Sequence, residues 1–183
     1  MKGIISHCFL FLAVSVGYVY LFDVSNREFY GILEGYYSGK VEELSKRNDE
    51  DSYIYRFNKF KDTLGEMSPG IKLYFSNLVD YQIARLLQNK EGRRNSSKSY
   101  SVLKSTQKSF LEWIASIDFK GLEIVIQIDI YRVLGDVNSM LLRYAGGVAL
   151  SKLANETRKY FEKSLKINSK NSFANTSIAS WYL

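Results

Sequence analysis

Cysteine and histidine, which often serve as nucleophile, general base or zinc ligand, occur once each, as Cys8 and His7. Both lie in an apolar N-terminal stretch, so residues 9–183 contain neither a thiol nor an imidazole. A Cys/His zinc site, a Cys–His nucleophile, a Ser–His–Asp triad and an internal disulfide are therefore excluded from that part of the chain. A fold without disulfides must rest on its packed core.

Carboxylates are the remaining candidates for catalysis, because a glycosidase needs only two of them. No Asp or Glu stands in a motif that separates it from an ordinary surface acid. The acidic cluster at residues 48–52 lacks the glycine and the final Glu spacing of an EF-hand loop. We therefore expect a protein that is not an enzyme, with no catalytic residues, no metal and no cofactor.

The net charge of +6 and the pI near 9.2 raise the question of nucleic-acid binding. Basic residues are spread along the chain and mixed with acids, as in residues 40–47 and 156–159, which is typical of a solvated helix face. The basic stretch at residues 89–98 has no interleaved aromatic residues for base stacking, and a mobile connecting loop is the better interpretation. We expect no nucleic-acid partner.

The N-terminal segment, residues 1–23, begins with Lys2 and then carries no formal charge from Ile4 to Phe22. One interpretation is a signal peptide, with small residues placed for cleavage. The other is an uncleaved transmembrane anchor, since 19 residues of helix span about 28 Å. Both interpretations tether or export the rest of the chain to the periplasmic, extracytoplasmic side of a membrane.

Residues 24–183 are long enough for one domain, and a content of 46% hydrophobic residues predicts a packed core. Apolar residues recur at helical spacing over most of this length. The periodicity predicts helices over residues 26–47 with a break near 38–39, and over 53–64, 71–89, 100–117, 140–152 and 160–167, with another beginning at 172. Pro69-Gly70 and Gly135-Asp136 are expected to end helices, and Asn155 to cap one.

Residues 121–134 fit two patterns. Leu122, Ile124, Ile126, Ile128 and Ile130 fall at every second position and alternate with Glu123, Gln127 and Asp129, as in a strand. No second segment with comparable alternation is available to pair with such a strand, whose backbone groups would then be unsatisfied. A helix is therefore favoured, and the predicted fold class is all-α.

Two stretches near the C-terminal end, residues 160–171 and 174–182, together resemble a tetratricopeptide (TPR) repeat. Residues 160–171 are similar to the second helix and following turn of that family, and residues 174–182 to the first helix of a next repeat. A weaker similarity lies at residues 36–44, which resemble the turn between the two helices. The positions that match the family's packing residues are Gly39, Val41, Leu44, Phe161, Ser164, Ala174, Ile178, Ala179 and Tyr182.

This resemblance implies stacked helical hairpins behind an N-terminal apolar helix, with a groove that binds partner proteins. It implies a non-catalytic adaptor or scaffold of the bacterial envelope. The run at residues 144–147, with residues 158–165 and 179–182, also looks like the TPR-bearing T-component of tripartite ATP-independent periplasmic transporters. That alternative implies an accessory of a solute transporter.

Overall fold

The computed structural model describes residues 27–32, 50–91, 98–116 and 118–179. Every regular element in these ranges is helical, so the predicted all-α class is confirmed. The chain forms two compact units, Met1–Lys72 and Leu73–Leu183. The N-terminal segment of residues 1–23 lies outside the described residues, and the prediction of one domain over 24–183 stays a prediction.

The first unit contains a helical segment at residues 27–32, helix α2 (Glu50–Thr63) and the 3-10 turn η1 (Leu64–Glu66). Three buried aromatic rings hold these elements together. The ring of Phe29 lies 5.8 Å from that of Phe57 and 5.9 Å from that of Phe60. The chain then enters α3 (Pro69–Glu91), whose first residue is proline, a residue favoured there because the first helical N–H has no partner within the helix.

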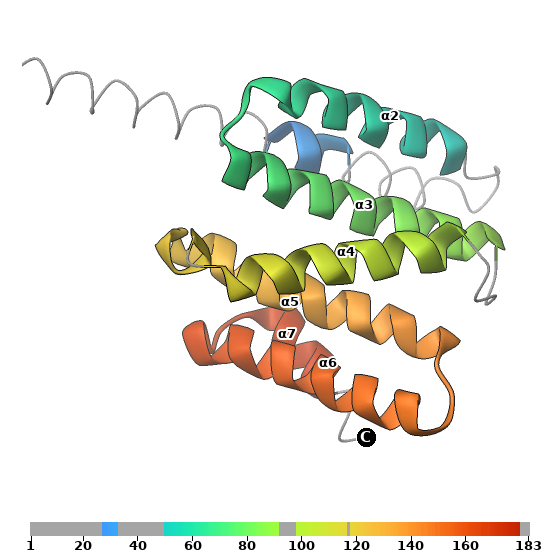
Figure 1. Ribbon diagram of the computed structural model, residues 1–183, viewed down its shortest axis with the longest axis vertical. Helices are drawn as coiled ribbons and strands as arrows, with labels where there is room; N and C mark the ends of the chain where they lie inside the picture. The colour runs from blue at the N-terminus through green and yellow to red at the C-terminus, as the bar shows by residue number, and fades with distance from the viewer. Residues whose placement is uncertain (1–26, 33–49, 92–97, 117, 180–183) are drawn as a thin grey trace, which may run out of the picture. The chain divides into compact units, whose positions relative to one another are not determined.

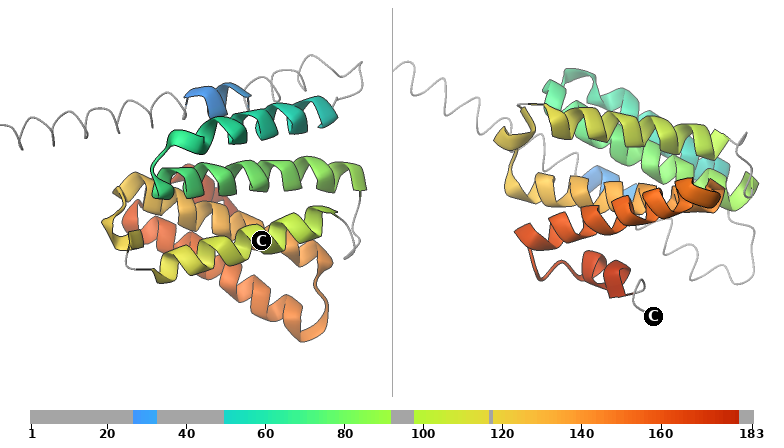
Figure 2. Two further views of the ribbon diagram at one scale, coloured as in Figure 1. Left: turned by 45° about the horizontal axis from the view of Figure 1, so that its top comes forward. Right: turned by 60° about the horizontal axis from the view of Figure 1, so that its bottom comes forward.

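The second unit holds residues 73–91 of α3 and the helices that follow it. These are α4 (Lys98–Ala115), η2 (Asp118–Gly121), α5 (Ile124–Leu141), η3 (Leu142–Tyr144), α6 (Gly147–Ile167) and α7 (Ser172–Ala179). Helix α5 lies between α4 and α6, and α7 packs against α6 (Figures 1 and 2). Fully buried side chains of the unit's core include Phe75, Leu103, Phe110, Ile130, Leu134 and Phe161.

The ambiguous segment at residues 121–134 is helical, as favoured. Its buried residues Ile126, Ile130, Val133 and Val137 recur at helical spacing along α5. Ile124, one of the residues that suggested a strand, is 65% exposed at the start of the helix. The apparent alternation therefore had two sources. Some of its residues form the buried stripe of α5, and Ile124 is an exposed apolar residue in the first turn of the helix.

The predicted break at Gly135-Asp136 is wrong, because α5 continues through it to Leu141. Gly135 is buried where α5 meets α6, and a Cβ atom placed on it would lie 2.7 Å from Cε1 of Phe161. The glycine permits a close approach of the two helices. Its small size serves packing inside the helix rather than termination of the helix.

The predicted helix over residues 140–152 and the cap at Asn155 are also wrong. The chain leaves α5 at Leu141, passes through η3 and begins α6 at Gly147, and α6 runs unbroken through Asn155. Gly147 has φ +56°, a left-handed conformation that glycine adopts without strain. This turn sets the start of α6, and Asn155 is an exposed residue inside that helix.

A ladder of three polar pairs joins α3 to α5 and to the η3 turn that continues it. Tyr74 donates to Asp129 at 2.7 Å, Tyr81 donates to Asp136, and Arg143 donates to Gln88 at 2.9 Å. Each pair joins residues 55 positions apart. Successive pairs follow after seven residues, about two helical turns. The constant offset means that α3 and α5 run parallel.

In the part of the chain that the structure describes, every helix is too short or too polar to cross a membrane.

Candidate functional site: a groove between helices α4 and α6

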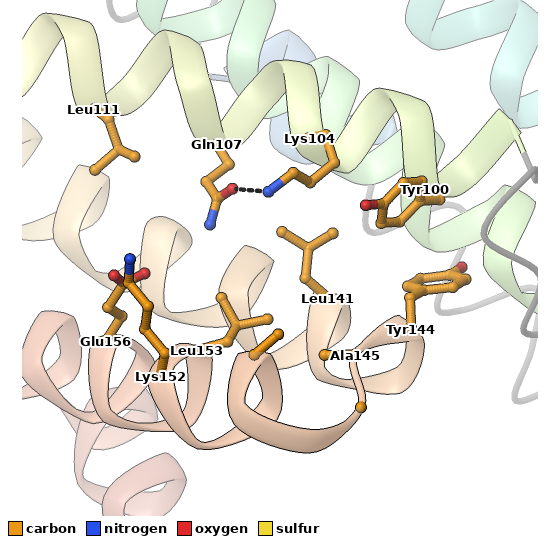
Figure 3. A pocket seen from close by; sticks show the side chains of 12 residues that line it. Tyr100, Lys104, Gln107, Leu111, Leu141, Tyr144, Ala145, Lys152, Leu153 and Glu156 are labelled. Atoms are coloured by element: carbon orange, nitrogen blue, oxygen red, sulfur yellow. Dashed lines mark hydrogen bonds between the residues drawn. The ribbon is translucent and has the colours of Figure 1, made fainter.

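A cavity of about 400 Å³ opens between α4 and α6, above the C-terminal end of α5. Its lining comes from α4, from α5 with η3 and the following loop, and from α6: Tyr100, Lys104, Gln107, Leu111, Leu141, Tyr144, Ala145, Gly146, Ala149, Lys152, Leu153 and Glu156. Figure 3 shows the side chains of α4 facing those of α6 across this space. We refer to it as the α4–α6 groove.

The α4 wall is one face of a helix. Tyr100, Lys104, Gln107 and Leu111 follow one another at intervals of four, three and four residues, so their side chains lie above one another along α4. The α6 wall begins only two residues after Gly147, at Ala149. The turn at Gly147 therefore decides which face of α6 borders the groove.

Two tyrosines close one end of the groove. The rings of Tyr100 and Tyr144 lie 5.2 Å apart. The Tyr144 hydroxyl accepts from Nε2 of Gln88 at 3.1 Å and lies 2.8 Å from Oγ of the buried Ser99. Because these partners come from α3 and α4, Tyr144 is held in place by two helices besides its own turn.

A relay of amides connects the α4 wall to the core. Nζ of Lys104 donates to Oε1 of Gln107 at 2.8 Å, and Nε2 of Gln107 donates to Oδ1 of Asn138 at 2.6 Å. Asn138 is fully buried in α5, and its Nδ2 has no hydrogen-bond partner. Lys104 and Asn138 together fix the amide orientation of Gln107, which keeps the middle of the groove polar between apolar neighbours.

Positive charge prevails around the groove. From Lys98 to Leu111 in α4, and from Val137 to Asn155 in the segments that form the floor and the other wall, the sequence contains no Asp or Glu. The charged residues of these stretches are Lys98, Lys104, Lys108, Arg143 and Lys152. Three acids directly border these stretches. They are Glu112, which pairs with Lys108 at 3.7 Å, Asp136, which accepts from Tyr81, and Glu156, which lines the groove.

The groove contains groups for binding rather than for bond-making. Its lining holds tyrosine, lysine, amide and aliphatic side chains with one carboxylate, and no thiol or imidazole. Among the described residues, no group of three or more His, Cys, Asp or Glu is placed to hold a metal ion. The arrangement suits apolar side chains flanked by hydrogen-bonding or negatively charged groups.

A second cluster of aromatic rings and a lysine lies where α5 meets α6. The rings of Tyr131 and Tyr160 stack at 6.3 Å with an interplanar angle of 18°, and Nζ of Lys163 lies 5.1 and 5.2 Å from the two ring centroids. Burial raises the pKa of both tyrosines, and burial together with Lys159 lowers the pKa of Lys163. For Tyr160, Glu156 and Tyr131 add smaller effects in the same direction. This cluster fastens two helices to each other through cation–π contacts.

The positions that matched the TPR pattern lie elsewhere. Phe161, Ser164 and Ala174 are buried, Ile178 is partly buried and Ala179 is exposed. Oγ of Ser164 donates to the carbonyl of Ile128 at 3.2 Å, so this small residue contacts the α5 backbone. Gly39, Val41, Leu44 and Tyr182 fall outside the described residues. None of the described matches lines the groove.

Sequence reasoning missed the groove residues. The spacing of Tyr100, Lys104, Gln107 and Leu111 marks one helix face, and it mixes polar with apolar residues where a core face would be uniformly apolar. That signal was available in the sequence. The opposing wall was not recognisable, because residues 140–152 were assigned to a helix of different bounds.

Neither a protein-family model nor a curated protein nor a solved structure matches the chain. The candidate site therefore rests on its own geometry.

Proposed function

We propose that this protein is a non-catalytic scaffold that binds a partner protein in the α4–α6 groove. The observation that carries the proposal is the groove itself, a cavity of about 400 Å³ with opposing helical walls and mixed apolar and polar lining. Grooves between helices are a recurrent site for peptides and partner helices, because they bury apolar side chains while their rims provide hydrogen bonds.

Apolar residues next to the groove support the proposal. Val148, in the first turn of α6, is 87% exposed, and Leu150 is 42% exposed. Residues 147–152 are all exposed, so the first turns of α6 have few neighbours within the chain. A partner seated in the groove would cover apolar surface that is open to water in the structure.

The TPR-like part of the proposal concerns α6 and α7. In this hairpin Phe161, Ser164 and Ala174 are buried, as the family's pattern requires of its packing residues, whereas Ala179 is exposed. Paired residues of α3 and α5 are 55 positions apart, which is longer than the 34-residue TPR period. We therefore restrict the TPR-like assignment to α6 and α7. Residues 1–23 would tether or export this scaffold to the extracytoplasmic side.

The test compares partner recovery by two variants of the full-length protein. Ala149→Trp places a large ring in the groove, whereas Ser151→Trp places the same ring on an exposed position of α6 outside the lining. Tagged proteins are purified from gently solubilised membranes and their partners quantified by mass spectrometry. We expect partners that co-purify with the wild type and Ser151→Trp to be lost with Ala149→Trp.

Equal recovery with both variants would contradict the groove as the binding site. Loss of a solute-binding protein or a transporter subunit with Ala149→Trp would identify the scaffold as a transporter accessory. Loss of other envelope proteins would support a more general adaptor.

A further inference from the structure

We propose that the α4–α6 groove takes an acidic amphipathic helix of the partner, an inference that rests on the proposed scaffold function and names the chemistry of its ligand. The occupant would place apolar side chains on the groove floor and carboxylates against Lys104 and Lys152.

Charge complementarity gives the first step. Lys104 and Lys152 lie on opposite walls, on α4 and α6, and both are exposed. Lys104 donates to Gln107, and its ammonium group has two further N–H donors. Glu156 is the only acid in the lining. A carboxylate between the walls would meet a cation from each side. The same two cations would repel a basic segment.

The dimensions of the groove give the second step. Tyr100 and Leu111 mark the two ends of the α4 wall, and the rise of eleven residues from one to the other is about 16 Å. Three turns of a partner helix have the same length. Leu141, Leu153 and Leu111 are distributed along the groove, as Figure 3 shows, so residues on one face of such a helix would each meet an apolar side chain.

The aromatic residues disfavour nucleic acid as the occupant. The rings of Tyr100 and Tyr144 pack against each other at 5.2 Å, and the Tyr144 hydroxyl is engaged by Gln88 and Ser99. Base stacking needs ring faces that are open to successive bases. A concave groove with an apolar floor also suits an inserted helix better than a flat layer of lipid headgroups.

The experiment uses two fluorescent 18-residue peptides that share leucines at helical spacing. One carries Glu and the other Lys at the remaining charged positions. Binding to the full-length protein in detergent is measured by fluorescence anisotropy. We expect the Glu peptide to bind about tenfold more tightly, a difference of about 1.4 kcal/mol, because two exposed charge pairs each make a small favourable contribution. The preference should weaken as salt is added.

Two double variants separate the groove from the net charge of the protein. Lys104→Glu/Lys152→Glu reverses both groove cations and should invert the preference toward the Lys peptide. Lys159→Glu/Lys170→Glu changes the net charge equally at exposed positions outside the lining and should retain the Glu preference. Circular dichroism of both variants checks that each one is folded.

Equal binding of the two peptides, no binding of either, or equal loss in both double variants would overturn the inference. Tighter binding to vesicles containing phosphatidylserine than to the Glu peptide, abolished by Lys104→Glu/Lys152→Glu, would overturn it in favour of a lipid headgroup. If Ala149→Trp loses partners while the wild type shows no Glu preference, the proposed function stands and the acidic-helix inference fails.

Discussion

The two sides of α5 pack by different chemistry. Toward α3, it contributes Asp129 and Asp136, which accept hydrogen bonds from Tyr74 and Tyr81. Toward α6, it contributes Gly135, whose lack of a side chain leaves space for the ring of Phe161. The bonds to α3 are directional and join ionisable groups, whereas Gly135 and Phe161 meet as closely packed apolar surfaces.

The comparison shows how a single helix can combine a contact that depends on pH with a contact that does not. Burial raises the pKa of Asp136 to about 6, an effect that the nearby Arg143 opposes. Asp129, two turns earlier, forms an ion pair with Arg132 at 2.6 Å. The contact between Gly135 and Phe161 contains no titratable group, so its stability does not vary with ionisation. Four predictions test this difference between the two contacts.

The largest effect is expected from Phe161→Ala. Phe161 is 2% exposed, and loss of a buried phenyl ring costs about 3–5 kcal/mol because transfer energy is lost and a cavity remains. Urea unfolding followed by circular dichroism measures the change. Ile167→Ala, at an exposed position of the same helix, serves as control and should cost less than about 1 kcal/mol. Equal losses of unfolding free energy in the two variants would show that the α5–α6 contact contributes no more to stability than an exposed residue does.

The contact of Asp136 with α3 should make the free energy of unfolding depend on pH. The pKa of Asp136 is raised from 3.8 to about 6 in the folded state, so the folded protein holds the proton more tightly than the unfolded chain. The contribution of Asp136 to the free energy of unfolding should therefore be largest below about pH 4, fall between about pH 4 and 6, and level off above. The total fall in this contribution is on the order of 3 kcal/mol.

Asp136→Asn keeps the neutral form at every pH and should remove this slope. Glu123→Gln, an exposed residue next to the start of α5 with no capping bond, should leave it unchanged. A slope of equal size in the Asp136→Asn variant would assign the pH dependence to other groups.

An intermediate effect is expected from Gly135→Ala. The new Cβ would lie 2.7 Å from Cε1 of Phe161, and this overpacking should destabilise the protein by about 1–2 kcal/mol after the higher helix propensity of alanine is included. Adding Phe161→Leu removes the ring. In that background Gly135→Ala should no longer destabilise, and a double-mutant cycle measures the coupling. Additive effects would mean that glycine is not needed for this contact.

The smallest effect is expected at the surface of α6. Arg158 and Glu162 form an ion pair at 2.7 Å, with both side chains about half exposed at 49%. Such a pair contributes about 0.3–0.5 kcal/mol because solvent screens it. Glu162→Gln should change the free energy of unfolding by no more than this amount, and added salt should reduce the difference further. A larger loss would identify a structural role that the geometry does not show.

Helical content was predictable from the sequence because the spacing of apolar residues reports which side of a helix is buried. Residues 71–89 and 100–117 were correctly assigned on that basis, and they correspond closely to α3 and α4. The ends of helices near glycine residues were less predictable. Gly135 was expected to end a helix and Gly147 fell inside a predicted one. In the structure Gly135 lies inside α5 against Phe161, and Gly147 starts α6 at positive φ.

The all-α class and the lack of thiol and imidazole chemistry after residue 8 were readable from the sequence, since both follow from residue types and local periodicity. The contact of Tyr81 with Asp136 across 55 residues, and the position of Lys104 and Lys152 on one groove, became visible only in the folded chain. Such pairs depend on how helices far apart in the chain are packed. Local spacing records which face of a helix is buried, but it does not record which other helix buries it.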